Sequence, residues 1–111
     1  MYQVGQGILG KIMFRDGIMP QYNRTYLIVK VDNNNISVLN VSSIQGKENK
    51  VMYRTNHVLN NYNPPFRKPS FVKLDSLTVV SESYVNSNCR LLSNGQPLLY
   101  SELDTIMHMV T

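Results

Sequence analysis

Two short apolar segments separated by four turn-forming residues constrain the fold of this sequence most strongly. Residues 25–31 (TYLIVKV) and 36–41 (ISVLNV) are rich in β-branched and aromatic side chains, which favour extended strands. Between them stands the run Asp32-Asn33-Asn34-Asn35, and Asn and Asp tolerate the left-handed backbone conformations of tight turns. The pattern therefore predicts that the two segments pair as a β-hairpin.

Turn residues divide the rest of the chain into short segments, as in a small all-β barrel. We expect further strands at residues 8–14, 50–54, 70–74 and 76–80. Residues 55–62 are consistent with a helical turn or a loop, and the prolines of residues 63–69 (NPPFRKP) predict a stiff loop. Asn94-Gly95 between apolar pairs predicts a tight turn. The absence of alanine argues against a helical bundle.

Only the last segment has the pattern of a helix. Ser101 is a suitable N-cap, and Glu102 follows it in the first turn, where the helix dipole favours negative charge. Apolar residues then recur at helical spacing: Leu103, Ile106, Met107 and Val110. We expect this stripe to pack on the sheet, so that residues 1–111 form one mainly β domain with a C-terminal helix.

Length and composition favour a soluble, cytoplasmic protein. The 111 residues are 42% hydrophobic and contain no apolar run close to a membrane span of about 18 residues. The N-terminus lacks the basic start and apolar stretch of a signal peptide. A net charge of +4 favours an anionic partner, such as nucleic acid or an acidic protein segment, and is equally compatible with ordinary solubility. Cys89 stands alone, which predicts a buried structural thiol.

Several motifs carry no chemistry of their own. Residues 5–10 spell GxGxxG, but a dinucleotide site needs a strand before the motif and a helix after it. We expect these glycines to allow close packing of the chain instead. His57 and His108 could serve as an acid–base pair, although nothing in the sequence places them together. No spacing of His, Cys, Asp and Glu predicts a metal site, and no cofactor is expected.

The order of four short motifs resembles the MazF/PemK family of toxin ribonucleases from type II toxin–antitoxin systems. The motifs are Gly10-Lys11-Ile12, residues 24–29 (RTYLIV), residues 39–43 (LNVSS) and residues 70–80 (SFVKLDSLTVV). The sequence departs from the family pattern at Lys11, Thr25 and Ser42, where Asp, Pro and Thr are usual. The resemblance implies a small SH3-like barrel of the plasmid-toxin type with a C-terminal helix, usually a homodimer.

The resemblance also implies metal-independent cleavage of single-stranded RNA by attack of a ribose 2′-OH, which leaves a cyclic phosphate and a 5′-OH. Arg24 matches the catalytic arginine of the family, and its planar fork is suited to a phosphate. Ser42 or Ser43 matches the position that donates a hydrogen bond to a phosphate oxygen. The implied partner, besides RNA, is an antitoxin with an acidic, disordered segment.

Cations and aromatic residues elsewhere suit single-stranded RNA. They are Tyr22, Lys47, Lys50, Arg54, Phe66, Arg67 and Lys68. Phe66 and Arg67 are expected to project as a recognition tip from the proline loop. The alternative is that the aromatic residues are half-buried and the cations merely solvated. An alternative function is a non-enzymatic barrel that binds a protein target through its C-terminal helix, as a gyrase poison does, or that binds nucleic acid without cleaving it.

Overall fold

The predicted hairpin is the longest paired element of the structure. The computed structural model describes residues 2–110, and in it β2 (Arg24–Asp32) pairs with β3 (Asn35–Ser43) in antiparallel register, from Thr25 opposite Val41 to Asp32 opposite Asn35. Asn33 adopts a positive φ of 56° in the turn, as the composition of the turn predicted. The hairpin prediction is confirmed.

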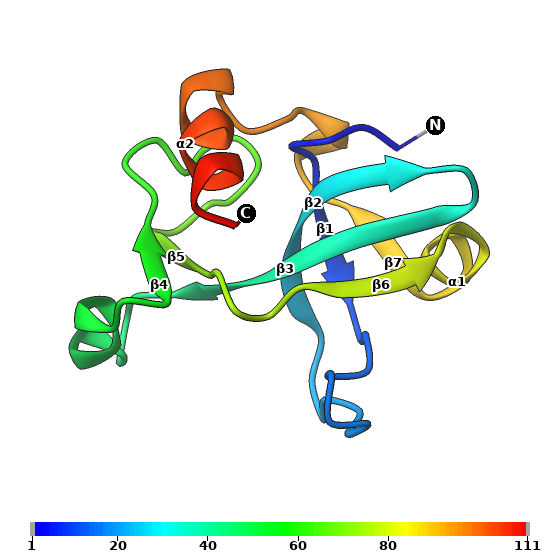
Figure 1. Ribbon diagram of the computed structural model, residues 1–111, viewed down its shortest axis with the longest axis horizontal. Helices are drawn as coiled ribbons and strands as arrows, with labels where there is room; N and C mark the ends of the chain where they lie inside the picture. The colour runs from blue at the N-terminus through cyan, green and yellow to red at the C-terminus, as the bar shows by residue number, and fades with distance from the viewer. Residues whose placement is uncertain (1, 111) are drawn as a thin grey trace.

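Five further strands extend the hairpin into one antiparallel sheet (Figure 1). They are β1 (Gly7–Gly10), β4 (Asn56–Val58), β5 (Ser70–Lys73), β6 (Thr78–Ser81) and β7 (Cys89–Leu91). The order is β4-β5-β3-β2-β1-β7, and β6 pairs with the first half of β3. Among residues 2–110 no ladder joins β4 to β7, so the strongly curved sheet remains open. The mainly β fold class is therefore confirmed.

Helices lie on both faces of the sheet. α2 (Tyr100–Val110) is the C-terminal helix, and its predicted apolar stripe packs on the core, with Ile106 fully buried. It begins one residue before Ser101, so the prediction of Ser101 as N-cap was wrong. α1 (Glu82–Asn88) follows β6 and is capped by the Ser81 hydroxyl, which accepts a hydrogen bond from the Tyr84 amide. Within residues 2–110, no helix has the length and apolar character needed to cross a bilayer.

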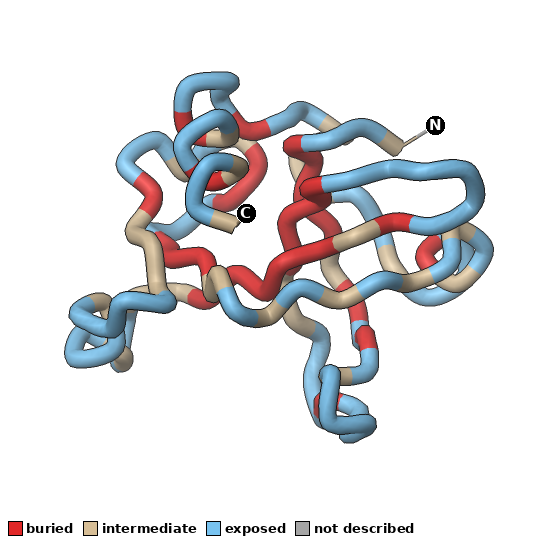
Figure 2. The backbone as a smooth tube through the Cα atoms, viewed as in Figure 1, coloured by how far each residue is buried: buried red, intermediate tan, exposed pale blue. Residues whose placement is uncertain are grey.

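Alternating side chains divide the core between the two faces of the sheet. The α2 face carries Leu27, Leu39 and Val72 beneath α2, whereas the α1 face carries Ile28 and Val38 with other aliphatic residues, together with Val85 of α1. Figure 2 shows the buried residues along the central strands and exposed residues on the projecting segments. Stability therefore comes from two apolar clusters that share the hairpin strands.

Some elements differ from the sequence predictions. The expected strand at residues 50–54 is wrong, because this segment overlaps the 3-10 turn η1 (Glu48–Met52), in which no residue is buried. Residues 55–62, where we expected a helical turn or a loop, contain the strand β4, and the first strand ends at Gly10 instead of residue 14. The predicted tight turn is present in the 3-10 turn η2 (Ser93–Gly95).

The glycine motif allows close packing, as expected. A Cβ atom on Gly7 would lie 2.8 Å from Cγ of Pro65, and one on Gly10 would lie 2.5 Å from Sγ of Cys89. Any side chain at these positions would force the backbone of β1 away from its neighbours. The partly buried thiol of Cys89 packs against the core cluster of the α1 face.

Candidate functional site

One end of the α1 face is polar and charged. Tyr26 and Val38 belong to the apolar cluster, but the next side chains along this face of β2 and β3 are Arg24 and Asn40, followed by Ser42. Ser42 stands opposite Phe71 in β5, so the side chain two residues further along β5, Lys73, shares their face. Strand register therefore brings Arg24, Ser42 and Lys73 to the same face and the same end of the sheet.

Four cations form what we call the cationic cluster: Lys73 and the three cations whose charges act on it, Arg24, Lys47 and Lys50. The ammonium group of Lys47 donates a 2.8 Å hydrogen bond to Oγ of Ser42, which is only 7% exposed. The pKa of Lys73 is lowered, first by burial and then by the positive charges of Lys47, Lys50 and Arg24, while Asp75 acts in the opposite sense. The charges of Arg24, Lys47 and Lys50 thus repel the charge of Lys73.

No acidic side chain compensates this charge directly. Among residues 2–110, no Lys or Arg nitrogen lies within 4.0 Å of a carboxylate oxygen. The guanidinium carbon of Arg24 lies 5.6 Å from the centroid of the Phe14 ring, and no hydrogen-bond partner reaches its buried Nε atom. Positive charge held in this way favours an anionic ligand that brings its own acceptor oxygens.

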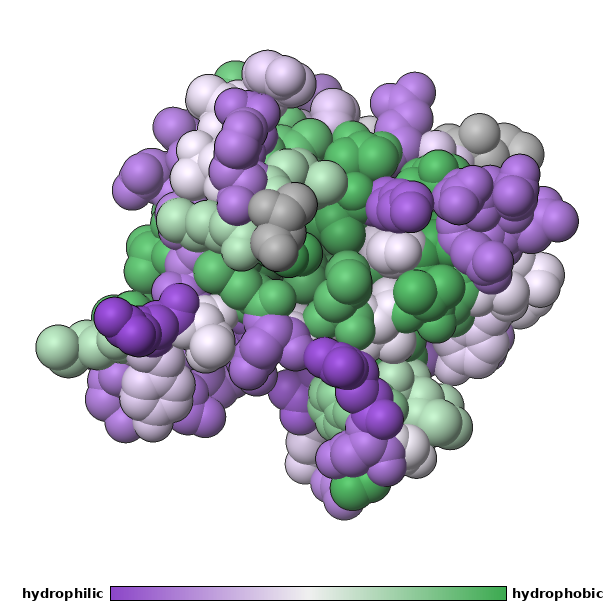
Figure 3. Space-filling model, in the orientation of Figure 1, coloured by the Kyte–Doolittle hydropathy of each residue, from purple (hydrophilic) through white to green (hydrophobic). Residues whose placement is uncertain are grey.

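A cavity of about 340 Å³ adjoins the cluster and shares Lys73 with it. Residues 12–16 line one side, and Asp75, Ser76 and Thr78 line another. Residues 11–23 and η1 project from the same side of the sheet (Figure 1), and Figure 3 shows a notch with hydrophilic residues between the two projections. The site is therefore open to solvent on this side of the molecule.

Tyr26 adds a neutral phenol to the lining of this cavity. Its Oη atom accepts a 3.3 Å hydrogen bond from the backbone N–H of Ile12. Burial raises the pKa of Tyr26 above its ordinary value, although the charge of Arg24 acts against this rise. The phenol consequently remains protonated at neutral pH and adds no negative charge to the site.

A second hollow, which we call the basic pocket, lies on the α2 face and has a volume of about 520 Å³. Four residues that the sequence grouped with Arg24 line it instead: Ser43, Phe66, Arg67 and Lys68. Ser43 lies on the opposite face from Ser42 because successive side chains of a strand alternate. The prediction that Phe66 projects was wrong, since it is 3% exposed and packs in the core, whereas Arg67 is exposed.

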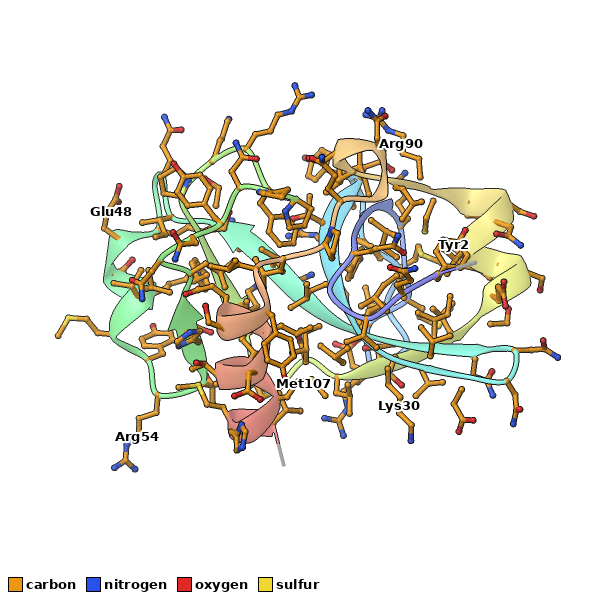
Figure 4. All side chains as sticks on the ribbon, turned by 90° about the horizontal axis from the view of Figure 1, so that it is seen from above. Tyr2, Lys30, Glu48, Arg54, Arg90 and Met107 are labelled. Carbon is orange, nitrogen blue, oxygen red and sulfur yellow. The ribbon has the colours of Figure 1, made fainter. Side chains whose placement is uncertain are left out.

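The remaining predicted RNA-binding residues lie apart from both hollows. Tyr22 is exposed on the projection formed by residues 11–23, and Figure 4 shows the side chain of Arg54 pointing away from the body of the molecule. Sequence reasoning missed Lys73 and Asp75, although the motif that contains them was recognised. The signal was alternation, because Lys73 is two residues from the buried Phe71 and so shares its face.

No group of three or more His, Cys, Asp or Glu side chains in the described part of the chain is arranged to hold a metal ion. No model of a known protein family matches the chain, and no curated protein matches it in sequence. We therefore argue function from the cationic cluster and from the short motifs that lead into it.

Proposed function

We propose that the protein is a metal-independent endoribonuclease that cleaves single-stranded RNA, as its resemblance to MazF/PemK toxins implies. The single observation that carries the proposal is the cationic cluster, in which three cations repel the charge of Lys73 and no carboxylate oxygen lies within 4.0 Å of a cluster nitrogen. A phosphodiester in the notch would relieve this repulsion. The same proposal includes an SH3-like barrel, for which the antiparallel sheet and the C-terminal helix are the support, although no ladder between described residues closes the sheet.

The reaction forms a bond between the ribose 2′-oxygen and the adjacent phosphorus and breaks the bond from that phosphorus to the 5′-oxygen. The transition state gathers negative charge on the non-bridging oxygens. The planar fork of Arg24 can donate two hydrogen bonds to these oxygens, and the Ser42–Lys47 pair supplies further donors at the same face. These groups stabilise charge as it develops and leave the proton transfers to other residues.

Lys73, which belongs to the cluster, and Asp75, which carries the opposite charge, both line the adjoining cavity. We assign the exposed carboxylate of Asp75 to accept the proton of the 2′-OH. The ammonium group of Lys73 then protonates the departing 5′-oxygen, and its lowered pKa makes it a better acid than an ordinary lysine. Protons are returned to and removed from these groups through the open solvent side of the notch.

The same surface suggests how the activity is held in check. An acidic, disordered antitoxin segment laid along the cationic cluster would exclude RNA by occupying its phosphate sites. The implied setting is a cytoplasmic homodimer with RNA and an antitoxin as its partners. This part of the proposal follows from the resemblance and from the charge of the cluster.

The test is incubation of purified protein with a pool of single-stranded RNA in EDTA, followed by mapping of the cut ends. Arg24→Ala is compared with Lys30→Ala, which removes an exposed cation at the far end of the same strand. We expect 5′-OH ends from the wild type and from Lys30→Ala, and a loss of about 10²–10³-fold in Arg24→Ala. Intact RNA after incubation with folded wild type contradicts the proposal.

A second candidate function is favoured by the exposed apolar residues Leu99, Tyr100 and Met109 at the start and end of α2. A non-enzymatic protein binder would use this helix rather than the notch. Replacing Tyr100 by Ser would then abolish capture of a partner, and Arg24→Ala would not. If RNA binds without being cleaved, the protein is a nucleic-acid binder on the same scaffold.

A further inference from the structure

We propose that the basic pocket on the α2 face binds one nucleotide of the single-stranded RNA whose phosphodiester lies in the cationic cluster. The inference rests on the proposed function only in its choice of RNA as the ligand. The pocket requires no cleavage, so its occupancy can be measured separately from catalysis.

The lining of the basic pocket matches a nucleotide in size and chemistry. Its volume of about 520 Å³ falls within the usual range for small-molecule sites. Its apolar lining includes Pro65 and Phe66, which are buried, whereas the cations Arg67, Lys68 and Arg90 are exposed. No Asp or Glu is among the lining residues. A base can therefore contact the apolar bottom while its phosphate meets the cationic rim.

The walls of the basic pocket are held in place before any ligand arrives. Oγ1 of Thr25 donates a 2.7 Å hydrogen bond to the carbonyl of Val41, and Oγ of Ser93 donates a 2.9 Å hydrogen bond to the carbonyl of Pro65. These bonds fix one wall to β3 and another to the proline loop. Little ordering is then required when a nucleotide binds.

The turn at one wall is held in an uncommon conformation. Ser93, Asn94 and Gly95 have φ values of 50°, 54° and 82°, so three successive residues are left-handed. Nε2 of Gln6 secures the turn by donating a 2.9 Å hydrogen bond to the carbonyl of Gly95. Left-handed residues other than glycine persist where the surroundings impose them, and they cluster at ligand sites. The exposed Asn94 amide can both donate to and accept from a base edge.

The basic pocket and the cationic cluster lie back to back at one end of β2 and β3. Arg24 belongs to the cluster and Ser42 accepts a hydrogen bond from it, whereas the next residue of each strand, Thr25 and Ser43, lines the basic pocket. Adjacent side chains of a strand point to opposite faces. An RNA strand that passes around the ends of these strands can thus place a phosphodiester on one face and a nucleotide on the other.

We would measure binding of a fluorescent 2′-O-methyl RNA octamer, which retains every phosphate and cannot be cleaved by its own 2′-oxygens. We expect Arg90→Gln to weaken binding about tenfold, because a charge-assisted contact is lost. Asn94→Asp keeps a residue that tolerates positive φ and adds a negative charge, so we expect a loss of similar size. Lys30→Gln is the matched control and should change binding less than twofold. Equal binding by the wild type, Arg90→Gln and Asn94→Asp overturns the proposal.

Two further measurements separate the possible ligands. Uridine 5′-monophosphate should shift the amide resonances of Leu92, Asn94 and Gly95 at concentrations where inorganic phosphate does not; equal shifts would mean a simple anion site and overturn the proposal. Binding of a glutamate-rich peptide, but not of the octamer, in an Arg90-dependent manner also overturns it. Arg90-dependent octamer binding without cleavage of ordinary RNA supports the pocket and contradicts only the catalytic function.

Discussion

The two ends of the α1 face are built from the same strands and have opposite chemistry. At one end Ile28, Ile36 and Val38 are fully buried beneath α1. At the other end the same alternation presents Arg24 and Ser42, flanked by two projecting segments instead of an α-helix. The comparison shows that one pattern of side-chain directions produces both an apolar end and a charged end, and that residue type decides which end is buried in the core.

The largest effect should come from the apolar end. Replacing Ile28 by Ala removes fully buried methyl groups, and we expect a loss of about 2–5 kcal/mol in the free energy of unfolding. Arg24→Ala at the polar end should cost less than about 1 kcal/mol, because this side chain makes no ion pair. Urea denaturation of both variants makes the measurement. Equal losses in the free energy of unfolding would mean that the charged end contributes as much to stability as the apolar end.

A smaller loss is expected from Gly10→Ala, which alters the backbone opposite Arg24. The new methyl group would lie 2.5 Å from Sγ of Cys89 and 2.8 Å from the carbonyl oxygen of Asn88, so β1 has to shift, at a cost of about 1–3 kcal/mol. Thermal unfolding of Gly10→Ala and of the double variant with Cys89→Ala tests the cause. The second change should recover part of the loss, and no recovery would assign the strain to the contacts that remain, which are the Asn88 carbonyl oxygen and the Cβ atom of residue 89.

Lys73→Met should separate stability from activity. Lys73 is half-buried among other cations, so its removal should raise the melting temperature while abolishing RNA cleavage. Because the folded-state pKa lies below 10.5, the folded protein binds fewer protons than the unfolded chain, and the wild type gains stability as pH rises from the lowered pKa toward 10.5. This rise should be missing in Lys73→Met. Identical dependence of stability on pH in the two proteins would mean that the pKa of Lys73 is not lowered by the other cations of the cluster.

The smallest effect should be stabilisation by inorganic phosphate at constant ionic strength. Phosphate at ten times its dissociation constant would stabilise the native state by about 1.4 kcal/mol through mass action. We expect Lys47→Gln to reduce this gain, because Lys47 helps to form the cluster beside Ser42. Scanning calorimetry in phosphate and in chloride makes the comparison. An equal gain in stability in the wild type and in Lys47→Gln would mean that phosphate binds at a site other than the cationic cluster.

Elements with a strong local pattern could be predicted from the sequence. The hairpin follows from β-branched runs around Asn33, and α2 follows from the spacing of Leu103, Ile106 and Met107. α1 was missed because its residues have low helix propensity and only Ser81 signals its start. β7 is three residues long and is defined by its pairing with β1, which no local pattern encodes.

The candidate site was predictable in part for the same reason. The motifs singled out Arg24 and Ser42, which share one face of the sheet, and Lys47, which was grouped with the RNA-binding cations, donates a hydrogen bond to Ser42. Ser43 and Arg67 were misplaced because the face of a strand and the path of a loop depend on partners far away in sequence. Phe66 was misjudged because a proline-rich loop was expected to project, whereas it folds back and fills the core under α2.

One hydrogen bond allows the polar end of the α1 face to be followed by hydrogen–deuterium exchange, without an attached label. β3 passes from its pairing with β6 to its pairing with β5, and between them the amide of Asn40 donates a 2.8 Å bond to Oγ of Ser76, which itself donates to the carbonyl of Lys73. A serine hydroxyl thus replaces a neighbouring strand at this point of the ladder. The rate of deuterium uptake at the Asn40 amide consequently depends on how firmly the segment with Lys73 and Asp75 is held in place. We therefore expect a bound phosphodiester to slow exchange at this amide.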